Sequence, residues 1–202
     1  MNKRIDIMTD IETLGVGTDA LIIQVSAIAF DIYTGEEIGR FDECVNINCM
    51  DKSELNIEPE TLQWWIRTDA ELLSDIMERG KEDGYGLEET LQEFKDWIDR
   101  RGSDEYNTNI YLWGNSPMFD NAKLQRQMEN YGIEYPIFYR NDRCQRTILE
   151  LTSLKLNRTI KEIQKLFEDE SLTKHDALDD CIYQIRLVSW CFNQLIGSNK
   201  NG

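Results

Sequence analysis

The sequence has little of several features that would identify common classes of protein. Its 202 residues include one histidine and three prolines, and no apolar run reaches the roughly 18 residues that a transmembrane helix needs. The five cysteines form no C-x-x-C pair, which excludes zinc-finger spacing and a disulfide framework and predicts buried free thiols. The opening segment MNKRIDIMTDIE is too acidic for a signal peptide. We therefore expect a cytoplasmic protein that contacts no membrane.

Positive charge is also scarce, and it is unevenly distributed. Lys and Arg number 22 against 38 Asp and Glu, so the net charge is −16, which argues against a nucleic-acid partner. Residues 1–120 carry most of the excess, whereas residues 121–174 are close to neutral. Two interpretations of that second segment stay open: a local basic wall on an acidic body, or an ordinary solvated surface, which charge alone favours.

Length and periodicity predict one α/β domain over residues 1–196, followed by a disordered tail at 197–202. Alternating or apolar runs indicate strands at 4–10, 20–32, 38–47 and 109–114, with a fifth short strand at 137–140 or 143–147. Helical spacing and capping residues indicate helices at 59–66, 87–102, 117–131, 159–167 and 176–196. A hairpin start followed by βα units is typical of a mixed sheet flanked by helices.

Carboxylates gather where predicted strands end. Asp10 and Glu12 are two residues apart at the end of the first strand, so they project to the same face. They either share a divalent cation such as Mg²⁺ or Mn²⁺, or are two solvated acids at an edge. Asp120 falls in the first turn of a helix with Ser116 as its N-cap. The helix dipole alone explains an acid there, although the position also lies near a strand end.

The stretch KHDALDDC, residues 174–181, places the only histidine beside three aspartates. With Thr173 as N-cap, Asp176 stands at the third helical position and completes a pair resembling a capping box. Local spacing does not choose between Asp179 and Asp180 as the functional acid. A lone histidine is usually structural or exposed. Beside a metal site, however, the imidazole of His175 is suited to proton transfer near neutral pH.

Taken together, the motifs DIET, GNSPMFD and HDALDDC resemble those of the DnaQ-like, DEDDh-type 3′→5′ exonucleases. The order and spacing agree over residues 5–190, and the resemblance is greatest to small phage-type exodeoxyribonucleases and related bacterial exoribonucleases. Cys181 stands where the family usually has alanine, and both residues are small. The strongly acidic composition is a second departure, and it argues against tight binding to long nucleic acid.

The resemblance implies an RNase H-like fold, a mixed five-stranded sheet in the order 3-2-1-4-5 with strand 2 antiparallel. It implies a soluble enzyme of a virus or bacterium, often a homodimer, that releases nucleoside 5′-monophosphates from the 3′ end of single-stranded DNA or RNA, with DNA slightly favoured. It favours Asp180 over Asp179. Two divalent metal ions, Mg²⁺ or Mn²⁺, would be held by Asp10, Glu12, Asp120 and Asp180, and His175 would be the general base.

The resemblance also implies substrate contacts. Thr13 and Leu14 would approach the terminal nucleotide, Leu14 as a wedge against a base, while Asn115 and Ser116 would reach sugar or phosphate. Trp64 and Trp65 would either stack on a base or pack in the core. The candidates for phosphate contacts are Lys123, Arg126, Arg143, Arg146 and Lys174. Two alternatives to an enzyme stay open: a catalytically silent nucleic-acid-binding module and an interaction protein.

Overall fold

The computed structural model describes residues 4–197, and most of the expected tail lies outside the described residues. Its centre is a five-stranded sheet in the order β3-β2-β1-β4-β5. The strands are β1 (Ile5–Thr13), β2 (Ile22–Phe30), β3 (Glu37–Cys44), β4 (Ile110–Gly114) and β5 (Asp142–Cys144). β2 runs antiparallel to β1 and β3, whereas β4 pairs parallel with β1 and β5. The predicted strand order and the antiparallel second strand are confirmed.

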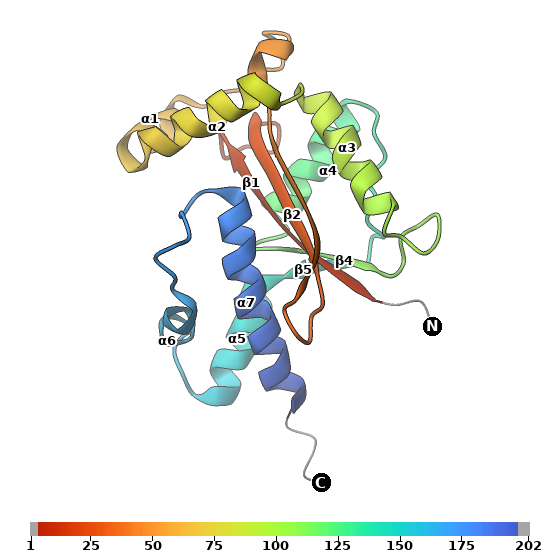
Figure 1. The fold of residues 1–202 in the computed structure, drawn as a ribbon, viewed down its shortest axis with the longest axis vertical. Coiled ribbons are helices and arrows are strands. Elements are labelled where there is room, and N and C mark those ends of the chain that lie inside the picture. Colours follow the sequence, from red (N-terminus) through yellow and green to blue (C-terminus); the bar gives the residue numbers. More distant parts are fainter. Residues whose placement is uncertain (1–3, 198–202) are drawn as a thin grey trace.

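Helices cover both faces of this sheet (Figure 1). α3 (Leu87–Asp99) and α4 (Asp120–Asn130) lie on one face, and α5 (Gln145–Leu156) and α7 (Ala177–Ile196) on the other, with the short α6 (Ile160–Gln164) beside α5. β1 is buried on both faces, because its side chains alternate: Ile7 and Ile11 pack toward α3 and α4, whereas Met8 packs toward α7. The same alternation places Asp10 and Glu12 on the α7 side.

A third apolar cluster closes the end of the sheet where β1 finishes. α1 (Pro59–Thr68) and α2 (Ala70–Asp83) lie across that end (Figure 1). Leu14, Trp65 and Ile76 are buried together there. Short 3₁₀ turns at Ile47–Cys49 and Lys165–Phe167 complete the elements of the described chain. Helices α1 and α2 therefore cover the end of the sheet where the predicted site residues lie.

Two helices, α2 and α5, were not predicted. α2 is mostly polar and contains Gly80, a residue that usually weakens a helix. The structure explains this glycine, since an added Cβ would lie 2.4 Å from the carbonyl oxygen of Val45. Gly80 thus allows α2 to pack directly on the chain that follows β3. α5 begins at Gln145, immediately after β5, and its β-branched residues and weakly amphipathic pattern obscured it.

Two helix starts also differ from the prediction. α4 begins at Asp120 rather than one turn earlier, because Ser116 opens a turn whose carbonyl accepts the N–H groups of Phe119 and Asp120. α7 begins at Ala177 with Asp176 itself as N-cap, in place of Thr173. Both shifts place a carboxylate directly at the start of a helix.

The cysteines bear out the expectation of buried free thiols in part. All five thiols are free; Cys44, Cys181 and Cys191 are buried, whereas Cys49 is exposed and Cys144 half-buried. Within the described chain, the helices lack the combination of length and apolar character needed to cross a bilayer.

Candidate active site

Asp10 and Glu12 lie next to each other on the α7 face of β1, and both are buried, with 8% and 9% of their surface exposed. In the antiparallel register Asp10 lies opposite Ser26 and Glu12 opposite Gln24. The side-chain amide of Gln184 donates to Asp10 Oδ1 at 2.7 Å. This contact links the acidic end of β1 to the middle of α7.

Asp120 reaches the same region from β4 and α4. It is the first residue of α4, it is 4% exposed, and it follows the end of β4 by six residues. Its carboxylate lies close over the strand end, because a Cβ built on Gly114 would be 3.2 Å from Asp120 Oδ2. β1 and β4 are parallel neighbours, so their carboxyl ends bring Asp10, Glu12 and Asp120 to one edge of the sheet.

The start of α7 supplies the histidine and a fourth acid. Asp176 caps the helix by accepting the N–H groups of Leu178 and Asp179. His175 has a left-handed backbone with φ of 68°, a region that non-glycine residues adopt sparingly, and its N–H lies 3.4 Å from Asp180 Oδ2. Side-chain donor atoms of Glu12, His175 and Asp180 lie within 4.8 Å of one another.

The neighbouring Asp179 is directed elsewhere. Its carboxylate accepts the N–H of Thr173 at 2.8 Å, closing the loop before α7. The structure thus brings Asp180, and not Asp179, beside Glu12.

Burial and mutual repulsion disfavour the charged forms of these acids. Desolvation, followed by repulsion from Asp10 and Asp180, raises the pKa of Glu12 to about 10. Desolvation and then the charges of Asp120 and Asp180 raise the pKa of Asp10 well above its usual range. Burial raises the pKa of Asp120 to about 6, and hydrogen bonds from backbone N–H groups and the charge of Arg146 offset part of this rise. Burial also raises the pKa of Asp180.

Such a cluster fits divalent cations, by the chemistry of its donors. Carboxylate oxygens suit Mg²⁺ and Mn²⁺, and a bound cation relieves the repulsion that raises these pKa values. The nearby guanidinium of Arg79 does not relieve the repulsion among these acids. It instead pairs with Asp176 at 2.8 Å and with Asp75 at 3.0 Å. The donor set therefore fits a metal centre of oxygen ligands.

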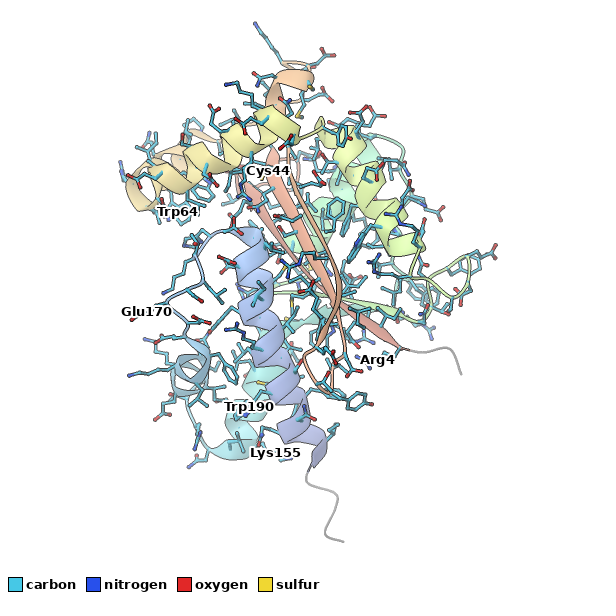
Figure 2. The ribbon with its side chains drawn as sticks, in the orientation of Figure 1. Arg4, Cys44, Trp64, Lys155, Glu170 and Trp190 are labelled. Carbon is cyan, nitrogen blue, oxygen red and sulfur yellow. The ribbon has the colours of Figure 1, made fainter. Side chains whose placement is uncertain are left out.

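An open groove of about 450 Å³ adjoins the acids. It is lined by Ile11, Glu12, Thr13, Gly15, Val16, Glu58, Glu60, Thr61, Trp64, Trp65 and Phe119. Trp64 is 42% exposed, and its ring centroid lies 5.0 Å from that of His175, edge to face. Figure 2 shows Trp64 on α1, facing the segment that leads into α7. The groove thus joins an apolar wall to the acidic cluster.

The structure changes the roles expected of Trp65 and Leu14. Trp65 is 1% exposed and its indole N–H donates to the carbonyl of Thr13 at 3.0 Å, so it supports the groove from beneath. Leu14 packs in the apolar cluster under α1 and α2 and does not line the groove. In this structure the tryptophan with an accessible face is therefore Trp64, and Leu14 has no free face to wedge against a base.

Asn115 and Ser116 are half-buried between β4 and α4. Nε of Arg146 lies 3.5 Å from Asn115 Oδ1, and the charge of Arg146 acts on Asp120. Of the basic residues expected at phosphate, Arg146 is therefore placed beside the acidic cluster.

The other basic candidates have different surroundings. Lys123 is buried, and its ammonium donates to backbone carbonyls, so it is not a phosphate contact. Arg126 pairs with Asp19 at 2.7 Å. Arg143 donates to the carbonyl of Arg140 and lies over the ring of Tyr111, and Lys174 is exposed. A continuous basic wall over residues 121–174 is not formed by these side chains.

Sequence reasoning missed two residues that order the site. Gln184 holds Asp10, and its position four residues after Asp180 on one helix face was a usable signal. Arg79 binds the capping Asp176, but it lies on the unpredicted α2, and no local pattern connects the two.

The family and the protein that this chain resembles in sequence are described as exonucleases. A family model described as the 3′-5′ exoribonuclease Rv2179c-like domain matches residues 5–192. An exodeoxyribonuclease of Enterobacteria phage T4 is 23% identical, over 95% of this chain and 91% of its own length.

Solved structures share the fold. Cell-death related nuclease 4 has a TM-score of 0.68 at 16% identity, and the match covers 95% of this chain but 64% of that one. The nuclease domain of 3′hExo, a DEDDh family member bound to rAMP, has a TM-score of 0.65 at 14% identity, covering 95% and 92%. The RNase H-like sheet expected from the sequence is confirmed by this likeness.

Proposed function

We propose a specific reaction for this chain, which belongs to the Rv2179c-like 3′-5′ exoribonuclease domain family and has the DnaQ-like exonuclease fold. It hydrolyses the terminal phosphodiester bond at the 3′ end of single-stranded nucleic acid and releases a nucleoside 5′-monophosphate. The observation that carries the proposal is the convergence of Glu12, His175 and Asp180 within 4.8 Å beside an apolar groove.

The acids would hold the metal centre. Asp10, Glu12, Asp120 and Asp180 are the proposed ligands of two divalent ions, Mg²⁺ or Mn²⁺. When bound, these ions neutralise the carboxylates and stabilise the charge that develops on the phosphate. Gln184 keeps one oxygen of Asp10 hydrogen-bonded and so fixes its orientation. The charged forms of the acids, which burial disfavours in the isolated protein, are then the working forms.

His175 is the proposed general base. Its imidazole accepts a proton from the attacking water as the new P–O bond forms. The bond to the 3′ oxygen of the preceding nucleotide breaks, and that oxygen takes up a proton from water to become the new 3′-hydroxyl. The left-handed backbone at His175 and its contact with Asp180 set the ring beside Glu12. Trp64 packs edge to face against the ring.

The groove would receive the terminal nucleotide. Trp64 and Phe119 present exposed ring surface at its rim, and Val16 is also exposed there. Stacking on aromatic surface tolerates any base, which suits an enzyme that must remove every nucleotide in turn. Thr13, Asn115 and Ser116 remain the candidates for polar contacts to the sugar and phosphate.

Different observations support DNA and RNA as substrates. The T4 relative is an exodeoxyribonuclease and supports DNA, the substrate that the family resemblance slightly favours. The description of the family supports RNA as the second candidate. The two differ at the 2′-hydroxyl of the terminal sugar, so discrimination depends on contacts within the groove.

A substrate panel tests the proposal. DNA and RNA octamers labelled at the 5′ end are incubated with the protein and Mn²⁺, and products are separated by size. A descending ladder of labelled products with nucleoside 5′-monophosphate release is expected, and Asp10→Asn should remove it. Intact oligomers of both kinds with the wild-type protein would refute the proposed activity. Cleavage that persists in Asp10→Asn would refute the metal-site assignment.

A further inference from the structure

The segment between β1 and β2 that lines the groove is held by a buried lysine. Lys123 extends from α4 with 1% of its surface exposed. Its ammonium donates to the carbonyl oxygens of Gly15 at 3.2 Å and Val16 at 2.7 Å, and also to that of Gly17. Three successive carbonyls therefore converge on one cation.

The same segment is held from its other side by Glu58. One carboxylate oxygen accepts the N–H of Val16 at 2.9 Å, and the other accepts that of Gly17 at 2.8 Å. A Cβ on Gly15 would lie 2.8 Å from the Glu58 side chain, and one on Gly17 would lie 2.9 Å from it. A Cβ on Gly15 would also lie 2.7 Å from the Cβ of Ala20, so the chain is closely packed at Gly15. Residues 15–17 are thus clamped between two opposite charges.

The position of this clamp connects it to the site. Lys123 lies one helical turn after Asp120 on α4, and its ammonium lies 4.4 Å from the centre of the Phe119 ring. Gly15, Val16, Glu58 and Phe119 all line the groove. Burying an ammonium group is costly unless it is fully hydrogen-bonded, so an apolar residue would serve simple packing better. The presence of an ammonium group at this buried position therefore indicates that Lys123 fixes the backbone to which it is hydrogen-bonded.

We propose that Lys123 and Glu58 are positioning residues that fix residues 15–17 as the wall of the groove against which the 3′-terminal base packs. This inference rests on the proposed function and deepens it. The side-chain hydrogen bonds of the clamp go to residues 15–17 and not to the four acids. The clamp determines how strongly the enzyme prefers a strand whose 3′-terminal nucleotide carries a base over a strand whose terminal nucleotide lacks one.

The test compares two octadeoxynucleotides, one ordinary and one whose 3′-terminal nucleotide lacks its base. Wild-type kcat/KM should favour the ordinary end by about 5- to 150-fold, the range that base stacking provides. Lys123→Met should reduce this preference at least fivefold, chiefly by raising KM for the ordinary end. Glu58→Gln, which weakens one of the two N–H contacts, should reduce it in the same direction. Lys81→Met, at an exposed lysine on α2, is the matched control and should keep the preference.

Other results would overturn the inference. If Lys123→Met loses kcat/KM equally on both substrates and needs more Mn²⁺, Lys123 acts through Asp120. If Lys123→Met folds and keeps the wild-type preference, the clamp has only a packing role. If that variant does not fold, an unchanged preference in Glu58→Gln would lead to the same conclusion. A wild-type protein inactive on both substrates would instead refute the proposed function, so the two failures are distinguishable.

Discussion

Without divalent ions, the protein should become less stable as the pH rises. The pKa of Glu12 is about 10 in the folded protein and 4.5 in a free side chain. Between these values the folded state holds a proton that the unfolded state has lost, so the free energy of unfolding falls with increasing pH. One retained proton costs about 1.4 kcal/mol per pH unit. From pH 5.5 to pH 8 the loss from Glu12 alone is about 3 kcal/mol, and Asp10, whose pKa burial raises well above its usual range, adds to it.

Other groups do not reverse this direction. Asp120, with a pKa raised to about 6 by burial, adds to the loss in the lower part of the interval. Surface acids such as Glu37 and Asp104 have lowered pKa values through hydrogen bonds to Arg40 and Thr108. Their contribution to stability is present above their unfolded pKa and is lost only as the pH falls. It is therefore already complete at pH 5.5 and constant above it.

Thermal unfolding in EDTA at pH 5.5 and pH 8 measures the effect. A loss of about 3 kcal/mol lowers Tm by roughly 6–12 °C in a domain of this size. Glu12→Gln should reduce the difference and raise Tm at pH 8, and Mn²⁺ should raise the wild-type Tm there. Glu89→Gln, at an exposed acid on α3, is the control and should behave as wild type. An EDTA-treated wild-type Tm that holds constant or rises with pH would show that the acidic cluster is not strained.

Three further outcomes concern single residues. Asp180→Asn should lose activity in an oligonucleotide ladder assay while Asp179→Asn retains most of it, and the reverse result would mean that the third motif is displaced by one residue. His175→Ala should slow turnover by about 10²- to 10⁴-fold with an unchanged Mn²⁺ titration; weaker Mn²⁺ binding with a rate restored at high Mn²⁺ would make it a ligand instead. Trp65→Ala should lower stability by about 3–5 kcal/mol in urea unfolding, whereas Trp64→Ala should leave stability near wild type and raise KM; equal stability losses would contradict their different burial.

The sequence predicted the sheet because its strands are marked locally. β1 alternates apolar and polar residues, whereas β2 and β4 are apolar runs, and their order follows from the family resemblance together with the hairpin start. The helices α2 and α5 were missed because their formation depends on tertiary contacts. Gly80 makes sense only against the carbonyl of Val45, which is far away in the sequence.

The site was predictable to a similar extent. The family resemblance of the motifs predicted Asp10, Glu12, Asp120 and Asp180 as site residues, and the fold brings these four acids to one edge of the sheet. It did not identify which tryptophan is exposed, because Trp64 and Trp65 are adjacent and differ only in the face of α1 they occupy. Nor did it show that Lys123 is buried, since a lysine on a polar helix is normally solvated.

The acidic composition and a polyanionic substrate are compatible if recognition is local. Arg126 and Arg79 are neutralised by aspartates of the same chain, and Lys123 is bound by backbone carbonyls. These side chains therefore add little attraction for a distant phosphate, and the acidic surface repels a long strand. Under the proposed function, affinity would then come from the strand end itself, through cations held by the buried acids and through base contact in the groove. An enzyme built in this way selects termini over internal sequence because only a terminus reaches both features at once.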